Sequence, residues 1–173
     1  MSNPSNFKLR LGLGAALLVL VSCSHQFSVS INDQAIFDPG DRLLTGQLAD
    51  PDLQGCVNLA LQQQGLQNSA MLAVLSCANS EISDLGNISQ LAQLRFLDLG
   101  NNNISNLTPL EGLTQLGGLN LTNNSVTDIA ALLNIPTLAS VSLLGNNEIP
   151  CRQLQLLQAK LGDNLSSPAS CKN

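Results

Sequence analysis

The sequence predicts an α/β solenoid: a short array of stacked units with a parallel sheet on its concave side and a capping helix at each end. Three observations support this prediction. A 22-residue period runs from position 72 to about position 160, short stretches in each unit alternate with period two, and helix-like segments flank the array. One unit cannot bury its own apolar face, so neighbouring units must stack into a continuous core.

The period is visible in the residues that recur. Each unit begins with a leucine, at Leu72, Leu94, Leu116 and Leu138. The ninth position is polar, as Ser80, Asn102, Asn124 and Asn146. The eleventh position is apolar, as Ile82, Ile104, Val126 and, slipped by one residue, Ile149. Agreement at several positions across four units indicates a true repeat.

The second unit reads Leu94-Arg-Phe-Leu97-Asp-Leu99-Gly-Asn-Asn102-Asn-Ile104. This L-x-x-L-x-L-x-x-N-x-I pattern, the 22-residue length and the I-x-D/N-L/I-x-x-L tail resemble the leucine-rich repeat of the internalin-like bacterial class. The resemblance covers about half of the chain and implies a fold. It implies no particular ligand, because this superfamily binds many different molecules.

Within each unit we expect a short strand at the L-x-L stretch, then a turn, then a convex arc. The ninth-position Asn should turn the chain, since its amide can bond backbone groups that would otherwise be buried and unpaired. We therefore interpret Asn102, Asn124 and Asn146 as structural. Ser80 departs from the pattern, and the convex side near Pro109 is expected to be a short helical turn or an irregular arc.

The first 22 residues have the features of an export signal. Two basic residues precede an apolar run over 11–21, which is too short to span a membrane comfortably. The run ends in Leu20-Val21-Ser22-Cys23, which resembles the bacterial lipobox and implies that Cys23 becomes the acylated N-terminus. A transmembrane helix and an ordinary secretory cleavage site are the alternatives. Ser24 in place of Asp favours the outer membrane, by resemblance to known sorting rules.

Four cysteines remain once Cys23 is set aside, an even number that suits an oxidising compartment. Contacts in a solenoid join nearest neighbours, so we predict the pairs Cys56–Cys77 and Cys151–Cys171. Each would contribute roughly 3 kcal/mol in the chain-entropy model. A zinc site is disfavoured because there is no C-x-x-C motif and only one histidine, and we expect no metal or cofactor.

Helix signals flank the array. Asp50 and Pro51 are typical of an N-cap and a first helical residue, and apolar residues on one face predict an amphipathic helix over 51–64. Pro150 should open a second helix that ends at Gly162. Cysteines in both caps resemble the ends of exported leucine-rich-repeat proteins. The expected segments are the signal peptide (1–22), lipid anchor and tether (23–49), N-terminal cap helix (50–71), repeats (72–149) and C-terminal cap (150–173).

Within the tether, alternation over 27–31 and a short apolar run over 35–37 predict either a strand packed on the N-terminal cap or disorder.

Composition narrows the class of function. Without the signal's two basic residues, the mature chain has five basic and twelve acidic residues, a formal charge of −7. It has no Trp, no Tyr and no basic stripe, which argues against nucleic acid. We also expect no enzyme, because no His, carboxylate and thiol set converges. Asp84 and Asp128 recur at one position on the arc, which favours a structural role.

The concave sheet is the remaining candidate surface. Its expected contact residues are Val74, Ser76, Arg95, Phe96, Asp98, Asn120, Thr122, Ser142 and Leu144. Interface centres are rich in aromatic residues and Arg, so Phe96 is the expected centre. The first hypothesis is a monomeric, membrane-anchored binding module of the bacterial cell envelope, for another envelope protein or a saccharide. The alternative is a structural envelope lipoprotein without a dedicated ligand on this face.

Overall fold

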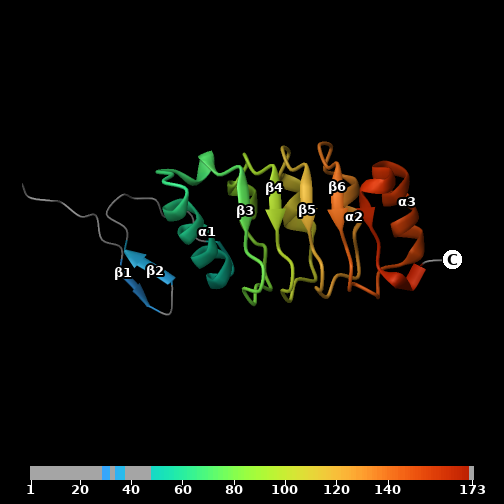
Figure 1. Ribbon diagram of the computed structural model, residues 1–173, viewed down its shortest axis with the longest axis horizontal. Helices are drawn as coiled ribbons and strands as arrows, with labels where there is room; N and C mark the ends of the chain where they lie inside the picture. Colours follow the sequence, from blue (N-terminus) through green and yellow to red (C-terminus); the bar gives the residue numbers. More distant parts are fainter. Residues whose placement is uncertain (1–28, 32–33, 38–47, 172–173) are drawn as a thin grey trace, which may run out of the picture.

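The computed structural model describes residues 29–31, 34–37 and 48–171 of the 173-residue chain. From position 48 onward the units stand side by side in an elongated row, with a helix at each end (Figure 1). The export signal, Cys23 and most of the tether lie outside the described residues. The strand predicted over 27–31 is described only in part, as β1 (Val29–Ile31), which pairs antiparallel with β2 (Gln34–Phe37).

A five-stranded parallel sheet forms one side of the row, in the order β3-β4-β5-β6-β7. Its strands are β3 (Val74–Ser76), β4 (Phe96–Asp98), β5 (Gly118–Asn120), β6 (Ser140–Ser142) and β7 (Leu165–Ser166). The central residues Leu75, Leu97, Leu119 and Val141 stand in register across the first four strands. Each 22-residue unit of the sequence therefore stacks on the next one, which confirms the predicted solenoid.

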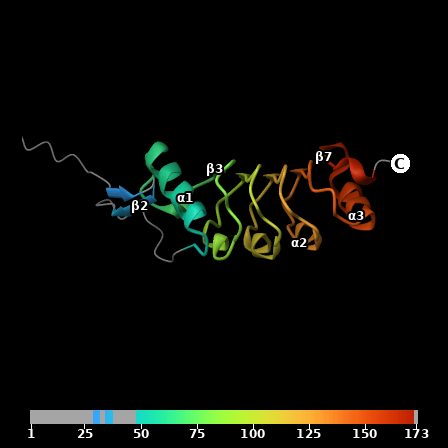
Figure 2. The ribbon, with the colours of Figure 1, turned by 90° about the horizontal axis from the view of Figure 1, so that it is seen from below.

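Short helical turns form the opposite side of the row (Figure 2). They are η2 (Ile88–Gln90), η3 (Thr108–Gly112) and α2 (Ala130–Leu133), one for each of the first three units. Between these turns and the sheet, the leucines of the repeat pack into one continuous apolar cluster, and Leu72, Leu94 and Leu97 are fully buried. Such a core is what a single unit could not have made.

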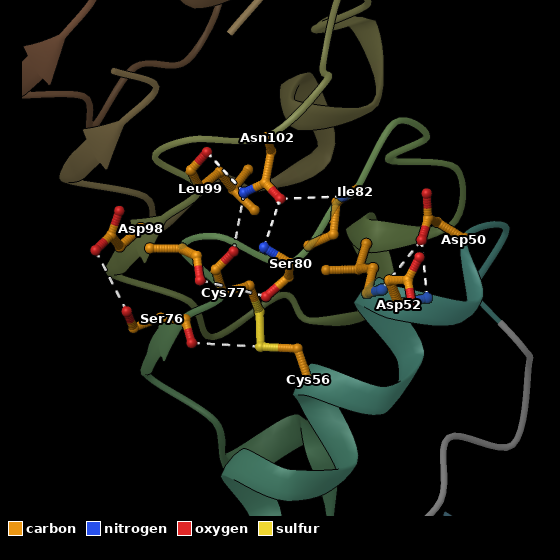
Figure 3. Close-up of a disulfide and its surroundings, with 12 residues drawn as sticks. Asp50, Asp52, Cys56, Ser76, Cys77, Ser80, Ile82, Asp98, Leu99 and Asn102 are labelled. Atoms are coloured by element: carbon orange, nitrogen blue, oxygen red, sulfur yellow. Dashed lines mark hydrogen bonds between the residues drawn. A yellow bond between two sulfur atoms is a disulfide. The ribbon is translucent and has the colours of Figure 1, made fainter. Parts of the chain in front are cut away.

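The asparagines of the ninth position join neighbouring units. Asn102 donates from Nδ2 to Cys77 O in the preceding unit and to Leu99 O in its own, each at 2.9 Å. Its Oδ1 accepts from the backbone N–H of Ser80 and Ile82 (Figure 3). Asn124 and Asn146 repeat this pattern one and two units further on. Their structural interpretation is therefore confirmed.

The eighth position needs a left-handed backbone. Asn79, Asn101 and Asn123 have φ values of 59°, 56° and 54°, and Gly145 has 83°. Asparagine and glycine tolerate this region better than other residues, which explains why they recur at the eighth position of the repeat.

The N-terminal cap is α1 (Pro51–Gln63), followed by η1 (Ser69–Met71). The helix crosses the outer edge of β3, where Gln64 Nε2 donates to Val74 O at 3.1 Å and Cys56 Sγ lies 3.3 Å from Ser76 O. Cys56 is bonded to Cys77, directly after β3, so this predicted disulfide is confirmed (Figure 3). The predicted helix over 51–64 ends one residue earlier, and Gly65 follows it with φ 63°.

Asp50 has two roles in this cap. Its Oδ1 accepts from the N–H groups of Asp52 and Leu53, which caps α1, and its Oδ2 accepts from Ser83 and Asp84 in the first unit. Burial of the carboxyl group opposes its ionisation, but these four backbone hydrogen bonds outweigh burial and lower the pKa of Asp50 below its ordinary value. One carboxylate thereby joins the cap to the array.

The C-terminal cap is α3 (Cys151–Leu161), followed by η4 (Gly162–Asn164), β7 and η5 (Ala169–Cys171). Leu154, Leu157 and Leu161 of α3 are buried in the same apolar cluster as the leucines of the repeats. The fifth strand, β7, was not predicted from the sequence and pairs with β6. Cys151 is disulfide-bonded; the side chain of Cys171 lies outside the described part, so the pair Cys151–Cys171 stays a prediction.

Candidate binding surface on the concave sheet

Three rows of side chains cross the concave sheet, because alternate residues of each strand point outward. The first row, at the start of the strands, is Val74, Phe96, Gly118 and Ser140. The second row is Ser76, Asp98, Asn120 and Ser142. The third row, just beyond the strands, is Ala78, Gly100, Thr122 and Leu144. The rows contain every predicted contact residue except Arg95, which is exposed directly before β4.

The first row contains two adjacent large apolar side chains. Val74 and Phe96 are 52% and 44% exposed and stand opposite each other in β3 and β4. A Cβ atom on Gly118 would lie 2.8 Å from Phe96 Cδ2, so the ring lies over the glycine backbone of β5. Phe96 therefore rests on the sheet and still offers much of its surface to solvent.

The second row is a ladder of hydrogen bonds. Asp98 Oδ1 accepts from Asn120 Nδ2 at 2.7 Å and from Gly100 N at 3.0 Å, and its Oδ2 accepts from Ser76 Oγ at 3.3 Å. Asn120 Oδ1 in turn accepts from Thr122 N at 3.0 Å. Cross-strand bonds of this kind hold the polar side chains in fixed positions. The ladder gives the sheet a rigid, partly buried polar surface.

The third row is less uniform. Thr122 Oγ1 and Ser142 Oγ share a hydrogen bond of 2.8 Å that links it to the second row, and Leu144 is exposed. Gly100 and Gly118 occupy outward positions of these rows but are buried beneath their neighbours. The surface open to a partner is consequently concentrated on β3, β4 and the ladder.

A hollow of about 350 Å³ lies between the loops that follow β5 and β6, with Ser125, Thr127 and Glu148 in its lining. Residues 48–171 and the described parts of β1 and β2 contain no group of three or more His, Cys, Asp or Glu side chains placed to hold a metal ion.

Comparisons with known proteins agree with this architecture. Residues 71–112 match the family model described as leucine rich repeats, in two copies. The crystal structure of an internalin (inlF) from Listeria monocytogenes is similar over 76% of this chain and 39% of its own, with 25% identity and a TM-score of 0.61. An internalin C2 (inlC2) from the same species is similar over 63% of this chain and 49% of its own, with 24% identity and a TM-score of 0.51. No curated protein matches.

The chain therefore carries leucine-rich repeats in an internalin-like fold, and none of these comparisons indicates a catalytic family. It spans less than half of the length of either internalin structure, so the likeness concerns the repeat fold.

Proposed function

We propose that this protein is a binding module of the bacterial cell envelope, which is anchored by lipid on Cys23 and contacts a partner protein with its concave sheet. The observation that carries the proposal is the exposed pair Val74 and Phe96. Apolar and aromatic side chains of this kind form the centres of protein interfaces, with polar groups around them. Here the ladder of Ser76, Asp98 and Asn120 borders the pair on the side of the strand ends.

The anchor rests on the motif Leu20-Val21-Ser22-Cys23. Several acyl chains on one cysteine would hold the protein stably at a membrane, since each buried CH₂ contributes about 0.8 kcal/mol. Ser24 favours the outer membrane as the destination. No helix in the described part of the chain is long and apolar enough to cross a bilayer. Mass spectrometry of the mature N-terminus tests the anchor: an unmodified terminus at another residue would refute it.

Capture from envelope extract tests the concave site. Phe96→Ala should weaken partner capture by about 2 kcal/mol or more, in the range of interface hot spots. It should change the melting temperature little, because the side chain is exposed and leaves no enclosed cavity. Leu156→Ala is the matched control, since Leu156 is 51% exposed on α3 and lies away from the sheet. Its capture should equal that of the wild type.

Leu97→Ala calibrates the stability measurement. Leu97 is fully buried, so its truncation should destabilise the fold by about 2–5 kcal/mol. If Phe96→Ala melts early, or if it captures the same proteins as Leu156→Ala, the concave centre is wrong. The alternative function, a structural envelope lipoprotein without a ligand on this face, would then be favoured.

A further inference from the structure

We infer that the concave sheet recognises an extended segment of its partner that carries a large apolar side chain and, two residues away, a Lys or Arg. The inference rests on the proposed function and specifies the chemistry of the partner. It follows from the spacing of two rows on β4, from the neutral hydrogen-bond partners of one carboxylate, and from the net charge of the described chain.

The spacing comes from the strand itself. Phe96 and Asp98 are two residues apart on β4, so they point to the same face about 7 Å from each other. An extended partner segment presents its side chains i and i+2 at the same spacing. A segment lying along β4 would therefore bring an apolar group over Val74 and Phe96 and its next same-side residue over Asp98.

The carboxylate at that second position favours a cation. Asp98 is the single ionisable residue among the twelve positions of the three rows. Its three hydrogen-bond donors, Ser76 Oγ, Gly100 N and Asn120 Nδ2, are all neutral. They orient the carboxylate without cancelling its charge, and no basic side chain of residues 48–171 forms an ion pair with it. A Lys or Arg of a partner would supply the missing counter-charge.

The described chain as a whole has the same sign, although Arg95 is exposed directly before β4. Residues 48–171 contain nine acidic and three basic residues. One of the three, Lys160, directs its ammonium group to three backbone carbonyls of its own chain. The net negative field would accelerate the approach of a basic segment and oppose an acidic one. Charge complementarity therefore favours a basic protein segment over an acidic peptide or a neutral saccharide.

Selection from a phage-displayed library of random 12-residue peptides, on the immobilised full chain, tests this inference. We expect enriched peptides to place Lys or Arg two residues from a large apolar residue. Their affinity should fall on the order of tenfold on Asp98→Asn and lose most of its salt dependence. An Asn at this position can still accept from Gly100 and Asn120, so the ladder persists without the charge.

Glu111→Gln is the matched control. Glu111 lies in η3 on the opposite side and also accepts from an asparagine, since Asn134 Nδ2 donates to its Oε1 at 2.9 Å. This variant also replaces a carboxylate by an amide and should change peptide affinity less than twofold. Equal losses in Asp98→Asn and Glu111→Gln would overturn the inference, because the effect would then be one of net charge.

Two further outcomes separate this inference from the proposed function. Enriched peptides that lack basic residues, and that bind wild type and Asp98→Asn equally but not Phe96→Ala, would overturn the basic-segment inference and leave the concave interaction site intact. A library without enrichment above the unselected pool would also overturn it. The capture experiment with Phe96→Ala and Leu156→Ala then decides the proposed function independently.

Discussion

The two ends of the array close the same sheet by different chemistry. At the N-terminal end, α1 covers the edge of β3 with side chains, and a disulfide and a shared carboxylate attach the cap to the first unit. At the C-terminal end, β7 adds a strand to β6, and side chains of α3 reach back to the last turn. An exposed strand edge invites pairing with other chains; α1 covers the edge of β3, whereas the edge strand at the other end, β7, is only two residues long.

The difference bears on function, because the N-terminal clamp holds the strand that carries half of the apolar pair. Cys77 follows β3 directly, and Val74 lies in the same strand. The predicted pair Cys151–Cys171 would instead join two elements of the C-terminal cap to each other, α3 and η5. We therefore expect that reduction of the disulfide and protonation of Asp50 would destabilise β3, and with it the candidate binding surface.

The largest expected effect is the loss of the N-terminal disulfide. Cys56→Ser together with Cys77→Ser should destabilise the protein by about 3 kcal/mol, because the unfolded chain regains the entropy of an open loop. Contacts in a solenoid are between neighbours, so the loss should appear first at β3. Hydrogen exchange of the backbone amides in each strand measures this.

The matched double variant is Cys151→Ser with Cys171→Ser. It should loosen the C-terminal cap while β3 and β4 keep their protection. If β3 loses equal protection in both double variants, the two ends are coupled through the array and do not respond independently.

Next in size is the shared carboxylate. Asp50→Ala should cost about 2 kcal/mol, since it removes the N-cap of α1 and leaves the N–H groups of Ser83 and Asp84 without their acceptor. Asp52→Ala is the control in the same first turn, because its side chain is exposed. Urea unfolding of the two variants should give a clearly lower midpoint for Asp50→Ala alone.

The lowered pKa of Asp50 predicts a pH dependence at the same end. A carboxyl group whose folded pKa lies below its ordinary value of 3.8 contributes stability above that value and loses it as the pH falls through the folded pKa. The wild type should therefore lose stability below about pH 4 more steeply than Asp50→Asn. Urea unfolding of both proteins at neutral and acid pH measures this. An equal loss of unfolding free energy in the wild type and in Asp50→Asn would contradict this role of Asp50.

The smallest effect is expected at the C-terminal end. Lys160 Nζ donates to the carbonyls of Leu132, Leu133 and Ile135, at 3.1, 3.0 and 2.7 Å, around the end of α2. Lys160→Met should lower the free energy of unfolding by about 1 kcal/mol, since these carbonyls can accept hydrogen bonds from water when the ammonium group is absent. Arg152→Met, on the same helix and exposed, should leave the melting temperature unchanged. If Lys160→Met destabilised the protein more than Asp50→Ala does, the C-terminal contact would be the stronger of the two, contrary to this prediction.

Much of this architecture could be predicted from the sequence because it is periodic or local. Four units in phase predicted the parallel sheet, and Asp50-Pro51 predicted the start of α1. Stacking between neighbours also predicted the pair Cys56–Cys77, since the two residues flank the start of the array. Each of these features depends on spacing along the chain, which the sequence displays directly.

Contacts between side chains of different units could not be predicted from the sequence. In its second role, Asp50 accepts hydrogen bonds from Ser83 and Asp84, which lie 33 and 34 positions further along the chain. No sequence motif near Ser83 indicates this contact. The place of Phe96 over Gly118 and the fifth strand β7 are of the same kind. The sequence by itself determined the repeat, its turns and its caps, because these follow from periodicity and local backbone preference. Only the tertiary structure decided which side chains of adjacent units meet, because that depends on how the stacked surfaces pack.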